Sequence, residues 1–290
     1  MTSRGCAVTE TPAAVPRYVK AVLTLTTIAL TLTTIVASKA TCHLASSLHA
    51  DILPVGWRDE RLIVTTEIDY EATGPNYAAE KLLDVRERVH QAIAAISAKI
   101  VPGMVEEDAV AMAREVLGEM GMRKGWHRVI VRFGPNTTKD FMADSEPGVV
   151  LGEQDIFFLD IGPVHGDTEG DAGQTFVFGD DPEQHKAARD VRALWDEVRE
   201  QWFTAGLTGT ALYEYAVKRA EELGWELNLD LSGHRLGDFP HEAHYDGSLA
   251  DADIRPNPNL WVLEMAIRHP TRQFGAFYED LLLEDQSFAS

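Results

Sequence analysis

Two carboxylates flank a glycine-rich turn in the middle of the sequence. Asp160 closes the apolar run at residues 156–159, and Asp171 precedes a second apolar run at residues 174–178. β-Branched and aromatic residues favour strands, so this stretch predicts a hairpin with one acid on each arm. Two facing carboxylates repel each other, and the pair costs stability unless a cation or a shared proton lies between them. Considered alone, two solvated strand ends would be the simpler interpretation.

Three further residues of the metal-binding types lie in the last quarter of the chain. His234 stands between two glycines, Glu264 ends an apolar run at residues 260–263, and Glu279 leads into another apolar run. Each of them alone could be an ordinary surface residue. A glutamate at the end of so apolar a strand is harder to explain, because burying it without a partner is costly.

Composition narrows the classes of function. The formal net charge of −20 argues against nucleic acid or an anionic membrane as a partner, because both carry phosphates that the protein would repel. An acidic chain is compatible with cation binding. Both cysteines, Cys6 and Cys42, lie near the N-terminus, which excludes a thiol nucleophile and a cysteine-rich zinc site from the rest of the chain.

The elements around these residues follow one order twice. Apolar residues recur at three- and four-residue steps from near Tyr77 and predict a helix, which Pro102 and Gly103 end before a second helix at residues 106–119. After the acidic hairpin, helices are predicted at residues 185–203 and 210–223. This order indicates two similar α/β halves with a site where they meet, unless the two helix pairs resemble each other by chance.

The first 50 residues differ from the remainder. Basic residues precede an apolar, threonine-rich run at residues 21–37, and small residues follow it. This segment fits a signal peptide, a short membrane anchor or a dispensable leader. We expect residues 1–50 to be an N-terminal extension and residues 51–290 to be the catalytic domain. A cytoplasmic location is expected, with export or anchoring through residues 1–40 as the alternative, and a membrane is a partner only if residues 21–37 act as an anchor.

Taken together, these residues resemble the metal site of one family. Asp160, Asp171, His234, Glu264 and Glu279 are similar, in order, to the five ligands of the pita-bread metallopeptidases, which include methionine aminopeptidase, aminopeptidase P, prolidase and the metal-free relative creatinase. The local motifs L-D-I-G, D-A-G-Q-T-F, G-H-R-L-G, L-E-M-A and F-Y-E-D agree. The resemblance runs from about residue 78 to residue 284. It implies the pita-bread fold, an α/β (α+β) architecture with two pseudo-symmetric halves around a curved antiparallel sheet.

The resemblance also implies a role for each ligand. Asp171 and Glu279 would bridge two divalent cations, Asp160 would bind one of them, and His234 with Glu264 would bind the other. Two such cations polarise a carbonyl and convert a bridging water into hydroxide, whose proton Glu264 would handle. This mostly oxygen donor set suits manganese, cobalt, iron or zinc.

The substrate-binding residues agree less completely with the family. His241 is similar to a family histidine that contacts the substrate carbonyl and stabilises developing charge there. A second family histidine usually lies between an asparagine-containing turn and the first aspartate. No histidine occurs between Asn136 and Asp160, and Phe141 or Met142 stands near the expected place. We therefore expect Phe141 to contact the substrate.

The resemblance predicts a dinuclear metal-dependent hydrolase, specifically an aminopeptidase that cleaves the N-terminal residue of peptides in the manner of methionine or Xaa-Pro aminopeptidases. Two alternatives stay open. One is a metal-dependent hydrolase of a small non-peptide amide, which the missing histidine favours. The other is a non-catalytic binding protein on the same scaffold, which would predict eroded ligands. The expected partner is a peptide, a homodimer is left open, and nucleic acid is excluded.

Overall fold

The computed structural model describes residues 69–122, 125–237 and 245–284. Contacts divide the chain into two units, Met1–Val64 and Thr65–Ser290, and every described residue belongs to the second unit. In the described ranges no helix has the length and apolar character that crossing a lipid bilayer requires.

Several predictions from the sequence fall outside the described residues. They are the extension at residues 1–50, its apolar run at residues 21–37, the domain boundary after residue 50, and the substrate-binding role of His241. These stay predictions.

Four long helices form the two pairs that the sequence predicts. They are α2 (Ala79–Ser97), α3 (Glu106–Glu119), α4 (Pro182–Glu200) and α5 (Gly209–Leu223). Asp181 caps α4, its carboxylate accepting hydrogen bonds from the backbone N–H groups of Glu183 and Gln184. Helix α4 continues into a π-helical turn, η2 (Gln201–Ala205), and ends at Gly206, whose φ of 65° is the left-handed conformation that glycine adopts without strain.

An antiparallel sheet packs with one face against the helix pairs. Its strands, in spatial order, are β1 (Ile130–Phe133), β2 (Asp155–Ile161), β5 (Ala172–Phe178), β9 (Gly275–Leu281), β8 (Trp261–Arg268) and β6 (Glu226–Leu227), with β7 (His234–Arg235) also paired to β8. Strands β3 (Val164–His165) and β4 (Thr168–Glu169) form a small hairpin between β2 and β5. Short 3-10 turns, η1 (Gly134–Thr138) and η3 (Leu249–Asp251), complete the described elements.

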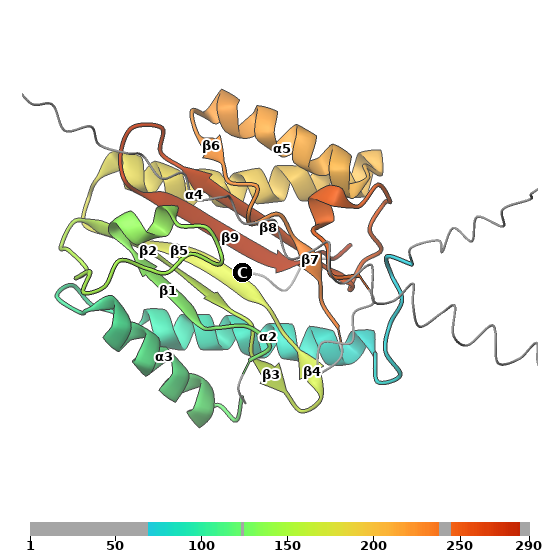
Figure 1. The fold of residues 1–290 in the computed structure, drawn as a ribbon, viewed down its shortest axis with the longest axis horizontal. Helices are drawn as coiled ribbons and strands as arrows, with labels where there is room; N and C mark the ends of the chain where they lie inside the picture. Colours follow the sequence, from blue (N-terminus) through green and yellow to red (C-terminus); the bar gives the residue numbers. More distant parts are fainter. Residues whose placement is uncertain (1–68, 123–124, 238–244, 285–290) are drawn as a thin grey trace, which may run out of the picture. The chain divides into compact units, whose positions relative to one another are not determined.

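The strand order is symmetric about the boundary between β5 and β9. Helices α2 and α3 run beside the half that contains β1, β2 and β5, whereas α4 and α5 run beside β8 and β9 (Figure 1). Val89 of α2 packs in one core cluster with Phe157 and Leu159, and Leu194 of α4 packs in another with Leu263. These two pseudo-symmetric α/β halves confirm the predicted pita-bread fold.

Alternation along the strands separates the apolar and acidic side chains. Leu159 on β2 and Leu263 on β8 face the helices and belong to the core clusters. Successive strand residues point to opposite faces, so their neighbours Asp160 and Glu264 point to the face that the helices leave uncovered. Glu279 on β9 is paired in register with Glu264 and shares its face.

The register then aligns the acids in one row across four strands. Asp160 lies opposite Gly173, Gly173 opposite Glu279, and Glu279 opposite Glu264. Gly173 is required in this row, because a Cβ atom there would lie 2.3 Å from the ring of Phe277. Residues far apart in sequence are thereby brought to one place.

The two halves are joined by few backbone pairs. Gly173 and Glu279 are the one pair in register between β5 and β9 in the described sheet. Beside them, the Thr175 hydroxyl donates to the carbonyl oxygen of Phe277 (2.8 Å) and accepts from its N–H (2.7 Å). A side chain therefore takes the place of ladder hydrogen bonds at this boundary.

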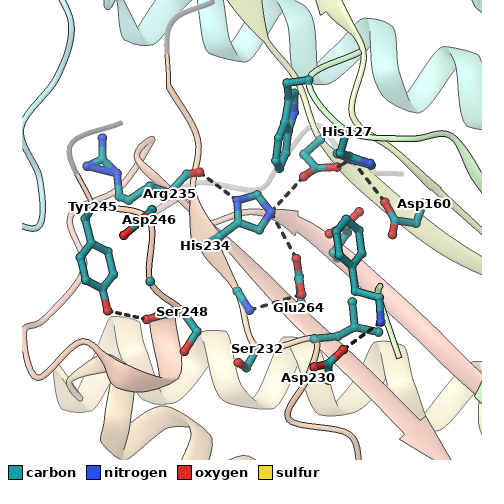
Figure 2. Close-up of a pocket in the computed structure, with 17 residues that line it drawn as sticks. His127, Asp160, Asp230, Ser232, His234, Arg235, Tyr245, Asp246, Ser248 and Glu264 are labelled. Atoms are coloured by element: carbon teal, nitrogen blue, oxygen red, sulfur yellow. Dashed lines mark hydrogen bonds and ion pairs between the residues drawn. The ribbon is translucent and has the colours of Figure 1, made fainter. Parts of the chain in front are cut away.

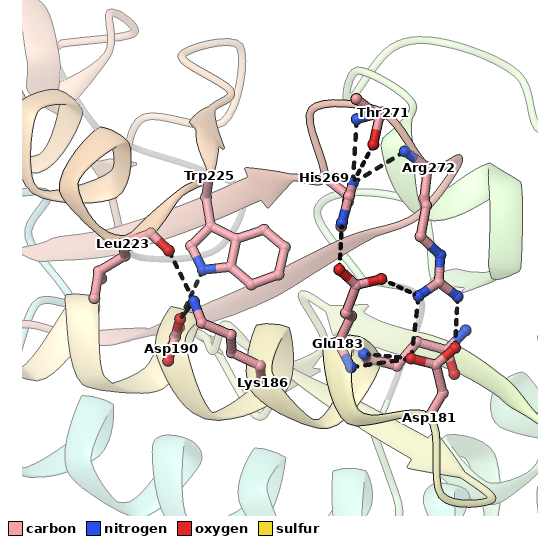
Figure 3. A network of polar contacts seen from close by, with 10 residues as sticks. Asp181, Glu183, Lys186, Asp190, Leu223, Trp225, His269, Thr271 and Arg272 are labelled. Carbon is pink, nitrogen blue, oxygen red and sulfur yellow. Dashed lines mark hydrogen bonds and ion pairs between the residues drawn. The ribbon is translucent and has the colours of Figure 1, made fainter.

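A network of ion pairs ties the start of α4 to the connection between β8 and β9 (Figure 3). Arg272 donates to both carboxylate oxygens of Asp181 (2.5 and 3.1 Å) and to Glu183 (2.6 Å). The hydrogen bonds from Arg272 lower the pKa of Asp181 to about 2 from its ordinary value of 3.8. Because this pKa is lowered in the folded state, the pair stabilises the fold above pH 3.8 and stops doing so as the pH falls through about 2.

Replacing Asp181 with asparagine is expected to lower the free energy of unfolding at neutral pH by about 0.5 to 1 kcal/mol. Asparagine keeps the helix cap but removes the charge, so the deficit reports on the charge of Asp181, which acts on Arg272 and on the N-terminus of α4. Urea unfolding between about pH 7 and pH 3 should show the deficit shrinking as the pH falls below the ordinary aspartate pKa. Asp180→Asn, at the exposed neighbouring position, is the control. If Asp181→Asn lowered the free energy of unfolding equally at about pH 7 and pH 3, the charge of Asp181 could not be the source of the loss.

Candidate metal centre

Four carboxylates are buried together on the uncovered face of the sheet. Asp160, Asp171, Glu264 and Glu279 are 3%, 2%, 6% and 1% exposed. Figure 2 shows Glu264 beside His234 and Asp160 beside His127, all in one pocket. Removing so many charges from water is strongly unfavourable unless positive charge lies among them.

His234 is held in a defined orientation at this cluster. Its ring atom Nδ1 lies 2.8 Å from the carbonyl oxygen of Arg235 and donates to it, while Nε2 lies 3.0 Å from Asp171 and 3.2 Å from Glu264. The backbone N–H of Gly233 donates to the second oxygen of Glu264 (3.3 Å). A histidine whose Nδ1 is fixed by a carbonyl offers its Nε2 lone pair as a metal ligand.

His127 is a site residue that the sequence did not predict. It precedes β1, its side chain is 6% exposed, and its Nε2 lies 3.2 Å from Asp171 and 3.5 Å from Asp160. The family pattern places its upstream histidine after the asparagine-containing turn, whereas His127 precedes Asn136. One signal was available in the sequence, the occurrence of His-Arg at both His127 and His234.

The electrostatics of the cluster show a demand for positive charge. Burial raises the pKa of Asp160 to about 7. Burial and the neighbouring carboxylates raise the pKa of Glu279 well above its usual value. Burial alone would lower the pKa of His127, but the charges of Asp171 and Asp160 outweigh it and raise this pKa to about 9. Protonated imidazoles supply positive charge in the protein alone, and divalent cations would supply it in their place.

The donor set fits divalent cations. His127, Asp160 and Asp171 form one group of three whose ligand atoms lie within 4.8 Å of one another, and Asp171, His234 and Glu279 form another. The Oε1 atom of Glu279 is buried without a hydrogen-bond partner among the described residues, which is costly for a carboxylate oxygen. Carboxylate oxygens combined with imidazole nitrogens are ligands that first-row divalent metals accept. Asp171 is common to both groups, so the cluster could hold two cations.

A cavity of about 310 Å³ opens onto the cluster. Phe141 lines it, with its ring centroid 5.8 Å from that of His127, and the predicted contact of Phe141 with the substrate stays a prediction. Met142, the other residue near the expected place, is 79% exposed. Besides the cluster, the lining includes Trp126, Asp230, Ser232, Tyr245, Asp246 and Ser248. The cavity therefore combines aromatic surface with carboxylates beside the candidate metal ligands, as in sites for small ligands.

A buried ion pair supports the site from the side of the helices. Asp280 follows Glu279 on β9 and accepts hydrogen bonds from Nε (2.6 Å) and Nη2 (2.5 Å) of Arg86 on α2. His90, one turn further along α2, lies 3.2 Å from the same carboxylate. The hydrogen bonds from His90 and Arg86 outweigh burial and lower the pKa of Asp280. The pair anchors β9, and with it Glu279, to α2.

Comparison with known proteins identifies the family. The sequence matches the model of metallopeptidase family M24 over residues 80–284, which includes all five predicted ligands. The chain belongs to metallopeptidase family M24. The family and the metallopeptidase class predicted from the sequence are thereby confirmed. No curated protein matches the sequence of this M24 chain.

Solved structures with the same fold include three peptidases. X-Pro aminopeptidase from Thermotoga maritima is 20% identical, with a TM-score of 0.57 over 69% of the M24 chain and 56% of its own. Prolidase from Pyrococcus horikoshii is 19% identical, with a TM-score of 0.57 over 71% and 60%. Methionine aminopeptidase from Thermotoga maritima is 17% identical, with a TM-score of 0.57 over 74% and 96%. The chain thus spans less than two thirds of the first two proteins, and the likeness is one of fold.

Proposed function

We propose that this M24 metallopeptidase is a dinuclear aminopeptidase that removes the N-terminal residue of peptides. The observation that carries the proposal is the buried cluster of four carboxylates and imidazole at one end of a cavity. In this proposal Asp171 and Glu279 would be shared by two divalent cations, Asp160 would bind one cation, and His234 with Glu264 would bind the other. Manganese, cobalt, iron and zinc are the candidate metals.

The bound cations would polarise the scissile carbonyl and lower the pKa of a water molecule. Glu264 is suited to take the proton of that water and return it to the leaving amine. One of its oxygens is held by the N–H of Gly233 (3.3 Å), and the other lies 3.2 Å from His234, so its carboxylate is fixed before the substrate arrives. His241 would stabilise charge that develops on the substrate carbonyl.

The cavity is suited to a peptide with a free amino terminus. Trp126, Phe141 and Tyr245 offer aromatic surface for a side chain. Asp230 and Asp246 add negative charge to the lining, which would attract the α-ammonium group. Structural relatives named X-Pro aminopeptidase and methionine aminopeptidase support this class of substrate.

Hydrolysis of a small non-peptide amide is the second candidate. The observation that favours it is Phe141, an apolar ring in the cavity near the place where the family has a substrate-binding histidine. A ring in this position offers packing but no hydrogen bond to a peptide. A cytoplasmic location, a homodimer and a domain boundary after residue 50 stay proposals.

Metal content, measured together with peptide cleavage, tests the proposal. The purified full chain supplied with manganese or cobalt is expected to hold up to two divalent ions, and Asp171→Ala is expected to lose them, because Asp171 is common to both candidate groups. Asp167→Ala is the matched control, since Asp167 lies nearby with a side chain 52% exposed. A wild-type chain without bound metal would contradict the proposal. In a panel of Met-Xaa and Xaa-Pro peptides, cleavage of none would favour the small-amide alternative.

A further inference from the structure

The acids of the site are related by the symmetry of the fold. Asp160 lies on β2 and Glu264 on β8, the strands adjacent to the central pair in the two halves. Asp171 immediately precedes β5, and Glu279 lies on β9, which are the central pair itself. Each half therefore supplies one carboxylate from its central strand or the residue just before it, and one from the next strand outward.

The two histidines follow the same relation. His127 precedes β1, which pairs with β2, and His234 lies on β7, which pairs with β8. In both places the next residue is arginine, and the carbonyl oxygen of that arginine lies near Nδ1 of the histidine, at 2.6 Å in the first half and 2.8 Å in the second. His127 is thus the counterpart of His234 in position, in sequence and in hydrogen bonding.

The Nε2 atoms of both rings are directed at carboxylates. His127 Nε2 lies 3.2 Å from Asp171 and 3.5 Å from Asp160, and His234 Nε2 lies 3.0 Å from Asp171 and 3.2 Å from Glu264. When Nδ1 donates to a carbonyl, a neutral imidazole carries a lone pair on Nε2. A lone pair facing two carboxylates is repelled unless a proton or a metal cation lies between them, and a metal cation in that place would make the imidazole a ligand.

The surrounding structure is shaped to hold the His127 ring. A Cβ atom on Gly162 would lie 2.1 Å from that ring, so only glycine leaves room for it. The backbone N–H of Trp126 donates to the carbonyl oxygen of Gly162 (3.1 Å), which fixes the segment before His127. The ring centroid of Trp126 is 4.5 Å from that of His127 and 5.0 Å from that of His234. One aromatic side chain thus contacts both imidazoles.

We propose that His127 is a sixth protein ligand of the metal centre, so that each half of the chain supplies one imidazole. The inference rests on the proposed function. His127 and Asp160 would bind one cation, His234 and Glu264 the other, and the remaining carboxylates would be shared. A centre with an imidazole for each cation should prefer cobalt, nickel or zinc over manganese more strongly than a centre with one imidazole, because nitrogen ligands suit those metals better.

The experiment is a cobalt titration of the metal-free full chain, followed by calorimetry and by the visible absorption of bound Co²⁺. Wild type should bind two ions, and His127→Ala should bind one ion with unchanged affinity and the second at least about tenfold more weakly. His234→Ala should weaken one site in the same way. Free imidazole should restore the second site of His127→Ala. His185→Ala is the control. His185 lies on α4, and its Nε2 hydrogen-bonds to the carbonyl oxygen of Gly179.

X-ray absorption of the wild-type dicobalt chain provides a measurement that needs no variant. One imidazole per cobalt ion is expected, whereas one imidazole for every two ions would overturn the inference. Two ions bound by His127→Ala with wild-type affinities would also overturn it, and a raised KM in that variant would make His127 a substrate-binding residue. In both cases the dinuclear centre itself would stand. A wild-type chain that binds no cobalt would overturn the inference and the proposed function together.

Discussion

Replacing Glu264 with glutamine is expected to lower kcat by about 10²- to 10⁴-fold, the range associated with loss of a general acid–base group. Glutamine has nearly the same size and can still accept the hydrogen bond from Gly233, but its amide cannot take a proton from water. The backbone carbonyl of Glu264 is held by the Tyr213 hydroxyl (2.9 Å), so the strand should keep its position. Initial rates with a cleaved peptide of the panel, measured alongside bound metal, provide the check.

Glu226→Gln is the matched control for this variant. Glu226 lies on β6, which pairs with the far end of β8 at Arg268, and its side chain is exposed. Its replacement should leave kcat unchanged. If Glu264→Gln kept its metal and turned over at the wild-type rate, Glu264 could not be the residue that handles the proton. Loss of metal together with rate would instead assign Glu264 as a ligand alone.

Replacing Arg86 with methionine is expected to lower the free energy of unfolding by about 3 to 5 kcal/mol. The change removes two hydrogen bonds, of 2.6 and 2.5 Å, from the fully buried carboxylate of Asp280 while keeping an apolar stem of similar length. His90, 3.2 Å away, would remain as the other partner. Urea unfolding near neutral pH measures the loss directly.

Two further variants separate this buried pair from a general effect of charge. Arg88→Met removes an arginine from the same helix, where it bonds to Asp84 in solvent, and should leave the unfolding free energy nearly unchanged. The double variant Arg86→Met, Asp280→Asn should recover part of the loss, because no charge then stays buried without a partner. Equal effects of Arg86→Met and Arg88→Met would contradict this account.

The elements and the family could be predicted from the sequence because their signals are local. The apolar stripe that includes Val89 and Ile93 predicted a helix, which is α2 in the structure. Asp160 and Glu264 each follow a leucine of the core, as the apolar runs before them indicate. The five motifs occur in one order along the chain, which made the resemblance to the family specific. The predicted fold was therefore confirmed, and the structure brings the five predicted ligands together.

His127 could not be predicted by the same means. Its nearness to Asp160 depends on the register between β1 and β2, in which Ile130 lies opposite Asp160. Register depends on the patterns of both strands and on the turn between them, and no tight turn joins β1, which ends at Phe133, to β2, which begins at Asp155. Phe141 was predicted to contact the substrate because it stands near the place of the missing family histidine; it lines the cavity, and that contact stays a prediction. Its contact with the His127 ring again depends on how two loops pack.

The sparse pairing between β5 and β9 gives the metal a thermodynamic role beyond chemistry. One registered pair and the hydroxyl of Thr175 join the two halves there, and the candidate ligands lie across that same boundary. Ions bound by both halves would act as a staple, adding about 2.7 kcal/mol to folding stability at a hundredfold excess over the dissociation constant. Amide hydrogens along this boundary should then exchange with solvent more slowly as metal is added, because bound ions would reinforce a boundary that has one registered backbone pair.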